Sequence, residues 1–468
     1  MKKKIISIAL SIVLSLSLFS CGQPASKVKD YGEFGANGRT PSWTKDLVMY
    51  EVNVRQYTSE GTFDAFREHL PELKEMGVTA LWIMPIHPIS ETRRSGKLGS
   101  YYSITDYRDV NPEFGTHEDF KELVDAAHAE GMYVLMDWVA NHTGWDSEWI
   151  KDHPDWYTQD ADGNIISPLN MGWPDVADLN FDNRDMRKEM IECMKYWITE
   201  FDVDGFRCDY ASGVPVDFWD EARAELQQVK PVFMLAEDGS SDSLLVNAFD
   251  MNYGWSLYDN LLQVARGNKK AVTVKYYAGK ELPSDGFTLN FLDNHDKNSY
   301  EHTIAEGFGY DAIPAMFALT YTIPGAPLIY SGDEVGLNQV ILFTSKSTIR
   351  WNQQKHDYRE YLRALADIRK ENEALFTGSF GGEIVFEKTE DEHVLCYHRD
   401  TEDNSILVVL NLSDKEASVD LTGLTDKKDK VLLRGYGENE RDLTEKKIDA
   451  ELLGEVTLKP WEYIIIER

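Results

Sequence analysis

The spacing of apolar residues changes repeatedly along the chain and predicts strands that alternate with helices from residue 45 to residue 376. Eight short runs are nearly continuous in apolar residues, which is typical of strands buried on both faces of a parallel sheet. Between most of these runs, apolar residues recur every three or four positions, as on one face of a helix. The predicted strands are 47–54, 79–85, 132–139, 203–209, 232–237, 248–251, 287–293 and 327–332.

Helical spacing is clearest in segments that follow these strands, and a further helical run ends at Phe201, just before strand 203–209. Eight strands alternating with helices predict an α/β protein with a closed (β/α)8, or TIM, barrel. An open doubly wound sheet is the alternative, but the count of eight and the lack of a glycine-rich phosphate loop favour the barrel. The predicted helices are 62–76, 116–130, 217–228, 256–275, 312–322 and 358–371.

Two segments depart from this alternation. Residues 142–178 are too long and irregular for a βα loop and are rich in Trp, Pro, Asp and Gly, so we expect a short subdomain inserted after the third strand. After residue 376 the runs alternate or are β-branched, with turns at short intervals. Residues 377–468 are therefore predicted to form a C-terminal antiparallel β-sandwich.

The N-terminus has the pattern of an export signal. Three lysines precede an apolar run from Ile5 to Phe19, which is typical of a secretory signal peptide. The run ends in Leu18-Phe19-Ser20-Cys21, which resembles a bacterial lipoprotein box, although a chance cysteine is the alternative. We therefore expect export, acylation of Cys21, and anchoring to a bacterial membrane, either at the outer membrane or cell surface or on the periplasmic face. The glycine-rich residues 22–44 would form a tether.

Composition narrows the range of partners. The 468 residues include 80 acidic and 48 basic ones, for a net charge of −32, which argues against nucleic acid or an anionic membrane surface as a binding partner. Twelve Trp and 23 Tyr suit contact with sugar faces, but core packing explains them equally well. Besides Cys21 there are three thiols in separate segments, which predict no disulfide framework.

Acidic residues lie at the C-terminal ends of several predicted strands. In a parallel barrel these ends meet at one face, where active sites are built from residues of different strands. Arg207 lies two residues before one of these carboxylates, and a purely structural ion pair is the alternative explanation of that pair. The acidic positions are Asp137, Asp209, Glu237 and the segment Asp293-Asn294-His295-Asp296.

A group of carboxylates with nearby histidines suits the cleavage of a glycosidic bond. One carboxylate attacks the anomeric carbon, and another, kept protonated by burial, protonates the leaving oxygen. Metal-dependent hydrolysis is the rival interpretation of His and Asp residues. However, the sequence contains no HxH or HExxH motif and its histidines are scattered.

From Met49 to the C-terminus the chain resembles the α-amylase superfamily of glycoside hydrolases. Three segments carry the resemblance: 137–142 (DWVANH) matches the family's DxxxNH, 205–209 (GFRCD) matches GFRxD, and 291–296 (FLDNHD) matches FxxNHD. Residues 177–180 (ADLN) and 324–334 (PGAPLIYSGDE) give further matches. The resemblance implies that Asp209 is the nucleophile, Glu237 the general acid/base and Asp296 the transition-state stabiliser.

The same resemblance implies a substrate site and a reaction. Substrate binding falls to Tyr102, which would stack on the sugar, and to Asp137, His142, Arg207 and His295. The implied reaction is cleavage of α-1,4-glucosidic bonds in starch, maltodextrins or related α-glucans by double displacement with retention. An oligosaccharide-specific α-glucosidase, a neopullulanase or a transglycosylase is the alternative within the family. A surface lipoprotein that binds glycans without catalysis is the alternative from a different class.

Calcium is the one cofactor that the resemblance suggests, and no organic cofactor is expected. The family's calcium site usually joins the asparagine of DxxxNH, an aspartate of the DLN segment, and a histidine four residues after the nucleophile. Asn141 and Asp178 match the first two positions, but the third is Gly213. Tyr210, directly after the nucleophile, is a second departure, since many members carry a small residue there.

Overall fold

The computed structural model describes residues 32–437 and 440–468. The predicted signal peptide, Cys21 and the first part of the predicted tether lie outside these residues, so export and lipid anchoring stay predictions. Within the described ranges, none of the helices is long and apolar enough to span a membrane.

Eight parallel strands close into a barrel, as the apolar runs predicted, and the open-sheet alternative is wrong. β1 pairs with both β2 and β10, which closes the ring. Its strands are β1 (Met49–Val52), β2 (Ala80–Ile83), β3 (Tyr133–Trp138), β6 (Gly205–Cys208), β7 (Phe233–Ala236), β8 (Met251–Tyr253), β9 (Phe287–Asn290) and β10 (Ala326–Tyr330). The order around the barrel is β1-β10-β9-β8-β7-β6-β3-β2.

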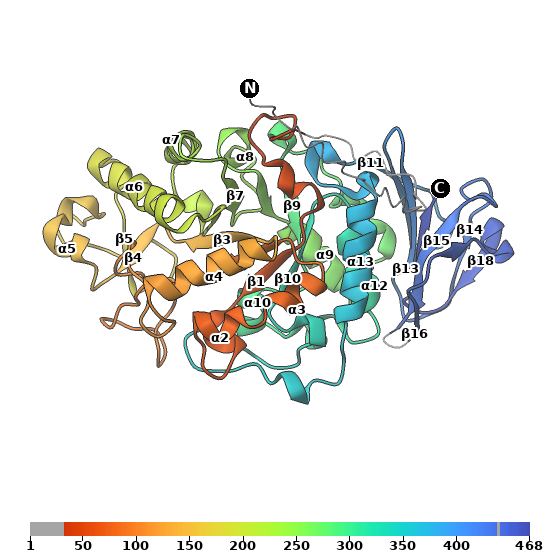
Figure 1. The fold of residues 1–468 in the computed structure, drawn as a ribbon, viewed down its shortest axis with the longest axis horizontal. Coiled ribbons are helices and arrows are strands. Elements are labelled where there is room, and N and C mark those ends of the chain that lie inside the picture. The colour runs from red at the N-terminus through yellow and green to blue at the C-terminus, as the bar shows by residue number, and fades with distance from the viewer. Residues whose placement is uncertain (1–31, 438–439) are drawn as a thin grey trace, which may run out of the picture.

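Helices between the strands cover the barrel (Figure 1). Local sequence explains several of their ends: Thr116 and Asp119 form a capping box at the start of α4, and Asp202 adopts a left-handed conformation at the end of α6. The helices are α1 (Val54–Tyr57), α2 (Phe63–Arg67), α3 (Leu70–Glu75), α4 (His117–Ala129), α6 (Arg184–Phe201), α7 (Val216–Leu226), α8 (Leu244–Asn247), α9 (Trp255–Ala265), α10 (His295–Tyr300), α11 (Ile304–Phe308), α12 (Ile313–Thr322) and α13 (Arg359–Glu371).

Three predicted elements differ from the structure. The helix predicted at 62–76 is split into α2 and α3, because Pro71 lies in the first turn of α3 and has no N–H to continue the earlier helix. The helix predicted at 256–275 ends at Ala265, since Gly267 follows with a positive φ of 70°. The strand predicted at 248–251 lies further along the chain, as β8.

The segment after β3 forms a small unit of its own. β4 (His142–Gly144) and β5 (Val176–Asp178) pair antiparallel, and the short helix α5 (Glu148–Asp152) lies between them in sequence. Figure 1 shows this unit at the opposite end of the molecule from the C-terminal strands. It carries His142 at the start of β4, directly after the barrel strand β3.

The C-terminal domain is antiparallel, as predicted. A seven-stranded sheet in the order β11-β12-β13-β19-β15-β16, with β17 on β15, packs beside the pair β14-β18. Its strands are β11 (Glu383–Phe386), β12 (Val394–Asp400), β13 (Ser405–Asn411), β14 (Ala417–Asp420), β15 (Lys430–Tyr436), β16 (Glu440–Asp442), β17 (Lys446–Lys447), β18 (Glu455–Leu458) and β19 (Tyr463–Glu467).

Side-chain alternation divides this sheet between two cores. On β13, Leu407 and Val409 belong to a core shared with β14 and β18, whereas Ile406 and Val408 belong to the large core that includes the barrel. On β12, the Tyr397 hydroxyl lies 2.5 Å from Oγ1 of Thr322 at the end of α12. One face of the sheet therefore packs directly on the barrel.

Candidate active site

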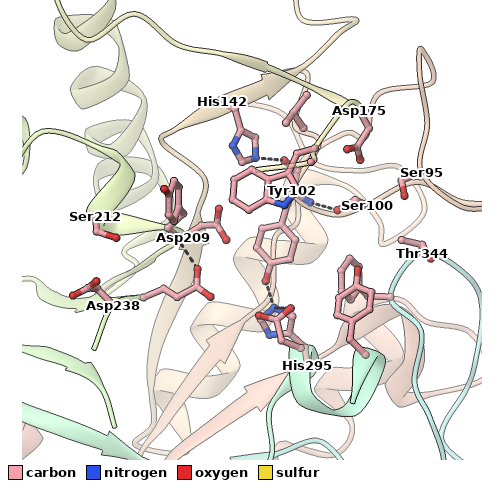
Figure 2. Close-up of a pocket in the computed structure, with 18 of the residues that line it drawn as sticks. Ser95, Ser100, Tyr102, His142, Asp175, Asp209, Ser212, Asp238, His295 and Thr344 are labelled. Atoms are coloured by element: carbon pink, nitrogen blue, oxygen red, sulfur yellow. Dashed lines mark hydrogen bonds and ion pairs between the residues drawn. The ribbon is translucent and has the colours of Figure 1, made fainter. Parts of the chain in front are cut away.

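A cavity of about 850 Å³ opens at the C-terminal ends of the barrel strands. Its wall brings together residues that follow seven of the barrel strands and that lie up to 251 positions apart in the sequence, from Arg93 to Thr344. Figure 2 shows Tyr102 between His142 and His295, with Asp209 nearby. Six predicted site residues line it: Tyr102, His142, Asp209, Glu237, His295 and Asp296.

Arg207 holds three carboxylates together beneath the cavity. Its side chain on β6 is fully buried, and its Nη1 lies 2.9 Å from Oδ1 of Asp137 and 3.0 Å from Oδ1 of Asp209. Its Nη2 lies 3.0 Å from Oε1 of Glu237. One guanidinium therefore gathers acidic groups from three neighbouring strands, β3, β6 and β7.

Burial raises the pKa of two of these carboxylates, Asp209 and Glu237. Desolvation raises the pKa of Asp209 to about 6, although the charge of Arg207 opposes the shift. Desolvation, together with the charges of Asp209 and Asp296, raises the pKa of Glu237 to about 7, again against Arg207. At neutral pH Asp209 is therefore mostly ionised, whereas Glu237 is protonated in a large fraction of the molecules.

The backbone directly after Asp209 turns sharply. Tyr210 has φ 41° and ψ 49°, a left-handed conformation that is uncommon for residues other than glycine. This turn directs its N–H to Oε2 of Glu237, at 2.8 Å. The ring packs edge-on against Trp173, with centroids 5.3 Å apart, so that both aromatic residues line the cavity beside the glutamate.

Tyr102 and His295 form the facing wall. Their rings stack with centroids 5.4 Å apart, and the Tyr102 hydroxyl lies 2.9 Å from Nε2 of His295 (Figure 2). The other nitrogen, Nδ1, lies 2.5 Å from Oε1 of Glu51 on β1. Burial lowers the pKa of His295, but the charges of Asp296 and Glu51 outweigh it and raise this pKa to about 9. His295 is therefore a cation at neutral pH.

His142 has a different environment. Its Nε2 lies 3.1 Å from the backbone oxygen of Tyr102, and its Nδ1 lies 3.2 Å from Nδ2 of Asn141. Burial lowers the pKa of His142 to about 4, so the imidazole is neutral. The ring lines the cavity beside Trp173, but both nitrogens already have partners in the protein.

Asp137 and Arg207, which were predicted to bind substrate, lie behind the residues of the cavity wall. Neither is among the described residues that line the cavity. Asp137 accepts hydrogen bonds from Trp82 Nε1 at 3.0 Å and from the Tyr102 hydroxyl at 3.2 Å, as well as the ion pair from Arg207. The structure therefore places both behind the residues that a substrate would touch.

The residues at the predicted calcium site do not fit the ion. Leu179 N donates to Asn141 O at 3.1 Å, which brings the two predicted segments together. However, a Cβ at position 213 would lie 2.2 Å from the ring of Tyr210, so this ring fills the space of a third ligand. Across the described residues, no three His, Cys, Asp or Glu side chains form a metal cluster. Two side-chain donors are few for an ion that takes six to eight oxygens, so the residues present assign no role to calcium in the reaction.

Several residues at the site were not identified from the sequence. Glu51 could have been noticed as an acidic residue inside the apolar run 47–54. Trp173, Tyr300 and Phe343 come from irregular loops and a helix end, where no periodic pattern marks them. Aromatic rings of this kind give a cavity wall the flat apolar surface that suits a sugar face.

Two family models match the chain and together cover most of it. The model of the alpha amylase catalytic domain matches residues 35–172 and 167–377. The model of the maltogenic amylase C-terminal domain matches residues 384–465.

Individual relatives agree with these models. The alpha-amylase MalA of Haloarcula japonica is 27% identical over 409 residues, which are 84% of this chain and 59% of that protein. The maltogenic alpha-amylase of Bacillus acidopullulyticus is 25% identical over 437 residues, which are 82% of this chain and 72% of that protein. The crystal structure of the maltogenic alpha-amylase AmyB from Thermotoga neapolitana superposes with a TM-score of 0.79 and 29% identity, covering 91% of this chain and 99% of that one.

Proposed function

The chain belongs to the alpha-amylase family of glycoside hydrolases, and from this premise we propose that it hydrolyses α-1,4-glucosidic bonds in starch, maltodextrins or related α-glucans with retention. The observation that carries the proposal is the contact of Asp209 and Glu237 with the same guanidinium, each at 3.0 Å. Carboxylates that share one guanidinium lie close together. This agrees with the spacing of about 5–5.5 Å that retaining enzymes require.

Asp209 attacks the anomeric carbon in the first step. Its raised pKa of about 6 leaves it ionised at neutral pH, and Arg207 keeps its carboxylate oriented. Glu237 gives its proton to the departing glycosidic oxygen as the bond breaks. The product of this step is a β-glycosyl-enzyme ester on Asp209 and a free leaving sugar.

A water molecule completes the reaction. Glu237, now ionised, takes a proton from the water, which attacks the anomeric carbon and releases Asp209. The N–H of Tyr210, 2.8 Å from Oε2 of Glu237, holds this carboxylate in place through both steps. The released sugar keeps the α configuration because the anomeric carbon is inverted twice.

The remaining residues bind the sugar whose bond is broken. The Tyr102 ring stacks on the apolar face of that sugar, while Asp296 contacts its hydroxyls and the His295 cation lies against Tyr102. The carboxylate of Asp296 also stabilises the positive charge that develops on the ring in the transition state. Asp137 and Arg207 act indirectly, through their contacts with Tyr102 and the two catalytic carboxylates.

Replacing Asp209 tests the reaction. Asp209→Ala should lower kcat by about 10⁴-fold or more, because the covalent step is lost, while binding of a malto-oligosaccharide persists and shows that the site is folded. Turnover near that of the unmodified protein would remove Asp209 from its role. The non-catalytic alternative would be supported if the unmodified protein released no reducing sugar from soluble starch, but its family membership does not favour that alternative.

Product analysis tests the substrate. Two relatives are named maltogenic alpha-amylases, which supports malto-oligosaccharides and starch as the substrates of this chain. An α-glucosidase, neopullulanase or transglycosylase activity is the alternative. Incubation with amylose, pullulan, cyclodextrin and isomaltose separates these activities by the products formed. Rapid release of short maltodextrins from amylose, with isomaltose intact, is the expected result.

We also propose that the protein is exported and lipid-anchored through Cys21, on the sequence pattern of residues 2–21. In cells that carry the full chain, labelling with a radioactive fatty acid should mark the protein. Cys21→Ser should abolish the label and release the protein from the membrane fraction. Equal labelling of both forms would exclude acylation at this residue.

A further inference from the structure

Glu51 is a buried carboxylate that none of the proposed steps uses. It lies on β1 with no exposed surface. Its Oε1 contacts His295 at 2.5 Å, while its Oε2 has no hydrogen-bond partner among the residues that the structure describes. A buried carboxylate with an unpartnered oxygen is costly compared with an uncharged side chain of the same shape. This cost indicates that the negative charge of Glu51 has a role in the protein.

The contact with Glu51 is the first of a continuous series. From Nε2 of His295 the series runs to the Tyr102 hydroxyl at 2.9 Å, and from that hydroxyl to Oδ2 of Asp137 at 3.2 Å. Asp137 in turn contacts Arg207, which holds both catalytic carboxylates. Glu51 is thus connected to the proposed reaction centre without touching the cavity.

The protonation of His295 decides the direction of these hydrogen bonds. If the ring carries both protons, Nδ1–H donates to Glu51 and Nε2–H donates to the Tyr102 oxygen, so the single phenolic proton is free to donate to Asp137. If the ring carries only the Nδ1 proton, Nε2 must accept that phenolic proton. Tyr102 then has none for Asp137. With Glu51 ionised, only the imidazolium satisfies all the contacts at once.

We infer that Glu51 is a positioning residue, which holds His295 as an imidazolium and thereby fixes the Tyr102 ring against the sugar whose bond is broken. This inference rests on the proposed function for its last step, the contact of Tyr102 with sugar. The first steps concern only the protein.

The charges around His295 agree with this assignment. Glu51 on β1, Asp137 on β3 and Asp296 on α10 face the ring with negative charge, and Tyr102 faces it as a neutral phenol. Arg207 on β6 is the opposing cation. The balance favours a protonated ring, as the raised pKa of about 9 for His295 indicates. Removing Glu51 deletes the carboxylate in direct contact with Nδ1.

Proton NMR of the full chain tests the first steps without any substrate. The proton between Nδ1 and Glu51 should give a far-downfield signal that persists to about pH 9 in the unmodified protein. The signal should vanish in Glu51→Gln and in His295→Gln. A matched control is Glu334→Gln, because Glu334 is equally buried in the barrel but accepts from the Tyr50 hydroxyl at 2.7 Å. This control should retain the signal.

Two outcomes overturn the assignment at this stage. One is a downfield signal that survives in Glu51→Gln. The other is the absence, in the unmodified protein, of any proton signal that titrates with a pKa well above 6.5. The second measurement needs no variant, so the inference stays testable even if Glu51→Gln does not fold.

Kinetics test the last step. Glu51→Gln should lower kcat on a malto-oligosaccharide by about 10- to 100-fold, because Tyr102 loses its fixed orientation, with a smaller change in KM. Glu334→Gln should leave both constants near those of the unmodified protein. An unchanged kcat in Glu51→Gln, with its downfield signal lost, would overturn the positioning role. Failure of the Asp209→Ala test would instead remove the proposed reaction and leave the NMR result standing.

Discussion

Two carboxylates that share one partner can still have different acidities. Asp209 and Glu237 both contact Arg207, and burial raises the pKa of each, to about 6 and about 7 respectively. The lower value suits a nucleophile, which must be ionised, and the higher value suits an acid, which must carry a proton. The single cation keeps both groups close together, as the proposed reaction at one glycosidic bond requires.

The pH dependence of kcat/KM should follow from these two values. The rate should rise as Asp209 loses its proton near pH 6 and fall as Glu237 loses its proton near pH 7, giving a narrow bell whose apparent constants belong to the coupled pair. Initial rates between pH 4 and pH 10 measure it. As a control, the residual activity of Glu237→Gln should lack the alkaline limb. A flat profile from pH 5 to pH 9 would contradict the assignment.

Tyr210 should influence which substrates are preferred. Its ring packs against Trp173 on the cavity wall beside Glu237, where the leaving sugar would depart in the proposed reaction. Tyr210→Ala should raise KM for a long malto-oligosaccharide about tenfold, the equivalent of one lost aromatic contact, with a small change in kcat. Tyr210→Phe should behave like the unmodified protein because it keeps the ring. Equal KM values for the alanine and phenylalanine forms would exclude this role.

At the scale of elements, the alternation of side chains along β6 places two residues of the candidate site, Arg207 and Asp209, on the same side of the strand. Along this strand, Arg207 and Asp209 alternate with Phe206 and Cys208, so the two pairs face opposite sides of the sheet. Arg207 contacts Asp137 and Asp209, while Phe206 packs against Trp138. The strand is preceded by α6, and the left-handed residue Asp202 ends that helix. The length of this connection sets which residues face inward, because a shift by one residue would exchange the two sets.

Gly205 at the start of β6 has no room for a side chain. A Cβ there would lie 2.0 Å from the backbone oxygen of Phe233 on β7. Gly205→Ala should therefore push β6 from β7 and lower the free energy of unfolding by about 3 kcal/mol or more. Thermal or urea denaturation measures the change. Gly454→Ala, with nothing within 4 Å of the added carbon, is the control and should alter stability little. A stable Gly205→Ala protein would contradict the close packing.

At the scale of the molecule, the barrel and the C-terminal domain are joined by buried polar contacts. Arg399 on β12 is almost fully buried and donates to backbone oxygens of Gly382 at 3.0 Å and Phe376 at 2.7 Å. Its Nη1 also reaches the oxygen of Thr322 at the end of α12, at 3.4 Å. Because such carbonyls would be left without donors if the domain separated, we expect the two parts to unfold together.

Stability should fall as the pH rises from about 6.5 to 9, above the range in which the depressed pKa of His142, about 4, acts in the opposite direction. Burial raises the pKa of Asp137 and Asp209 to about 6 and of Glu237 to about 7, so each stabilises the fold below its unfolded value near 4 and loses this contribution as the pH rises. The raised pKa of His295, about 9, acts in the same direction above pH 6.5 and is worth on the order of 3 kcal/mol. Denaturation at constant ionic strength measures this. Higher stability at pH 9 than at pH 6 would contradict it.

The hydrophobic pattern was sufficient to predict the barrel, the inserted segment and the antiparallel C-terminal domain. Strand and helix periods are local properties, and a chain with eight buried strands alternating with helices has few ways to hide them. The same pattern predicted helices that continue through Pro71 and Gly267, where a single residue interrupts the helix although the apolar spacing continues. The sequence also predicted that the acidic residues at the strand ends lie at one face of the barrel, because the C-terminal ends of parallel strands meet there.

The sequence alone thus determined the architecture and six of the residues that line the mouth of the barrel, but not Trp173, Tyr300 or Phe343. Only the tertiary structure decided how these residues meet: that Arg207 joins three carboxylates, that Tyr210 turns its N–H to Glu237, and that Glu51 lies under His295. Glu51 and His295 are 244 residues apart. Contacts between such distant residues depend on strand register, tilt and side-chain orientation across the closed barrel, which no local period encodes.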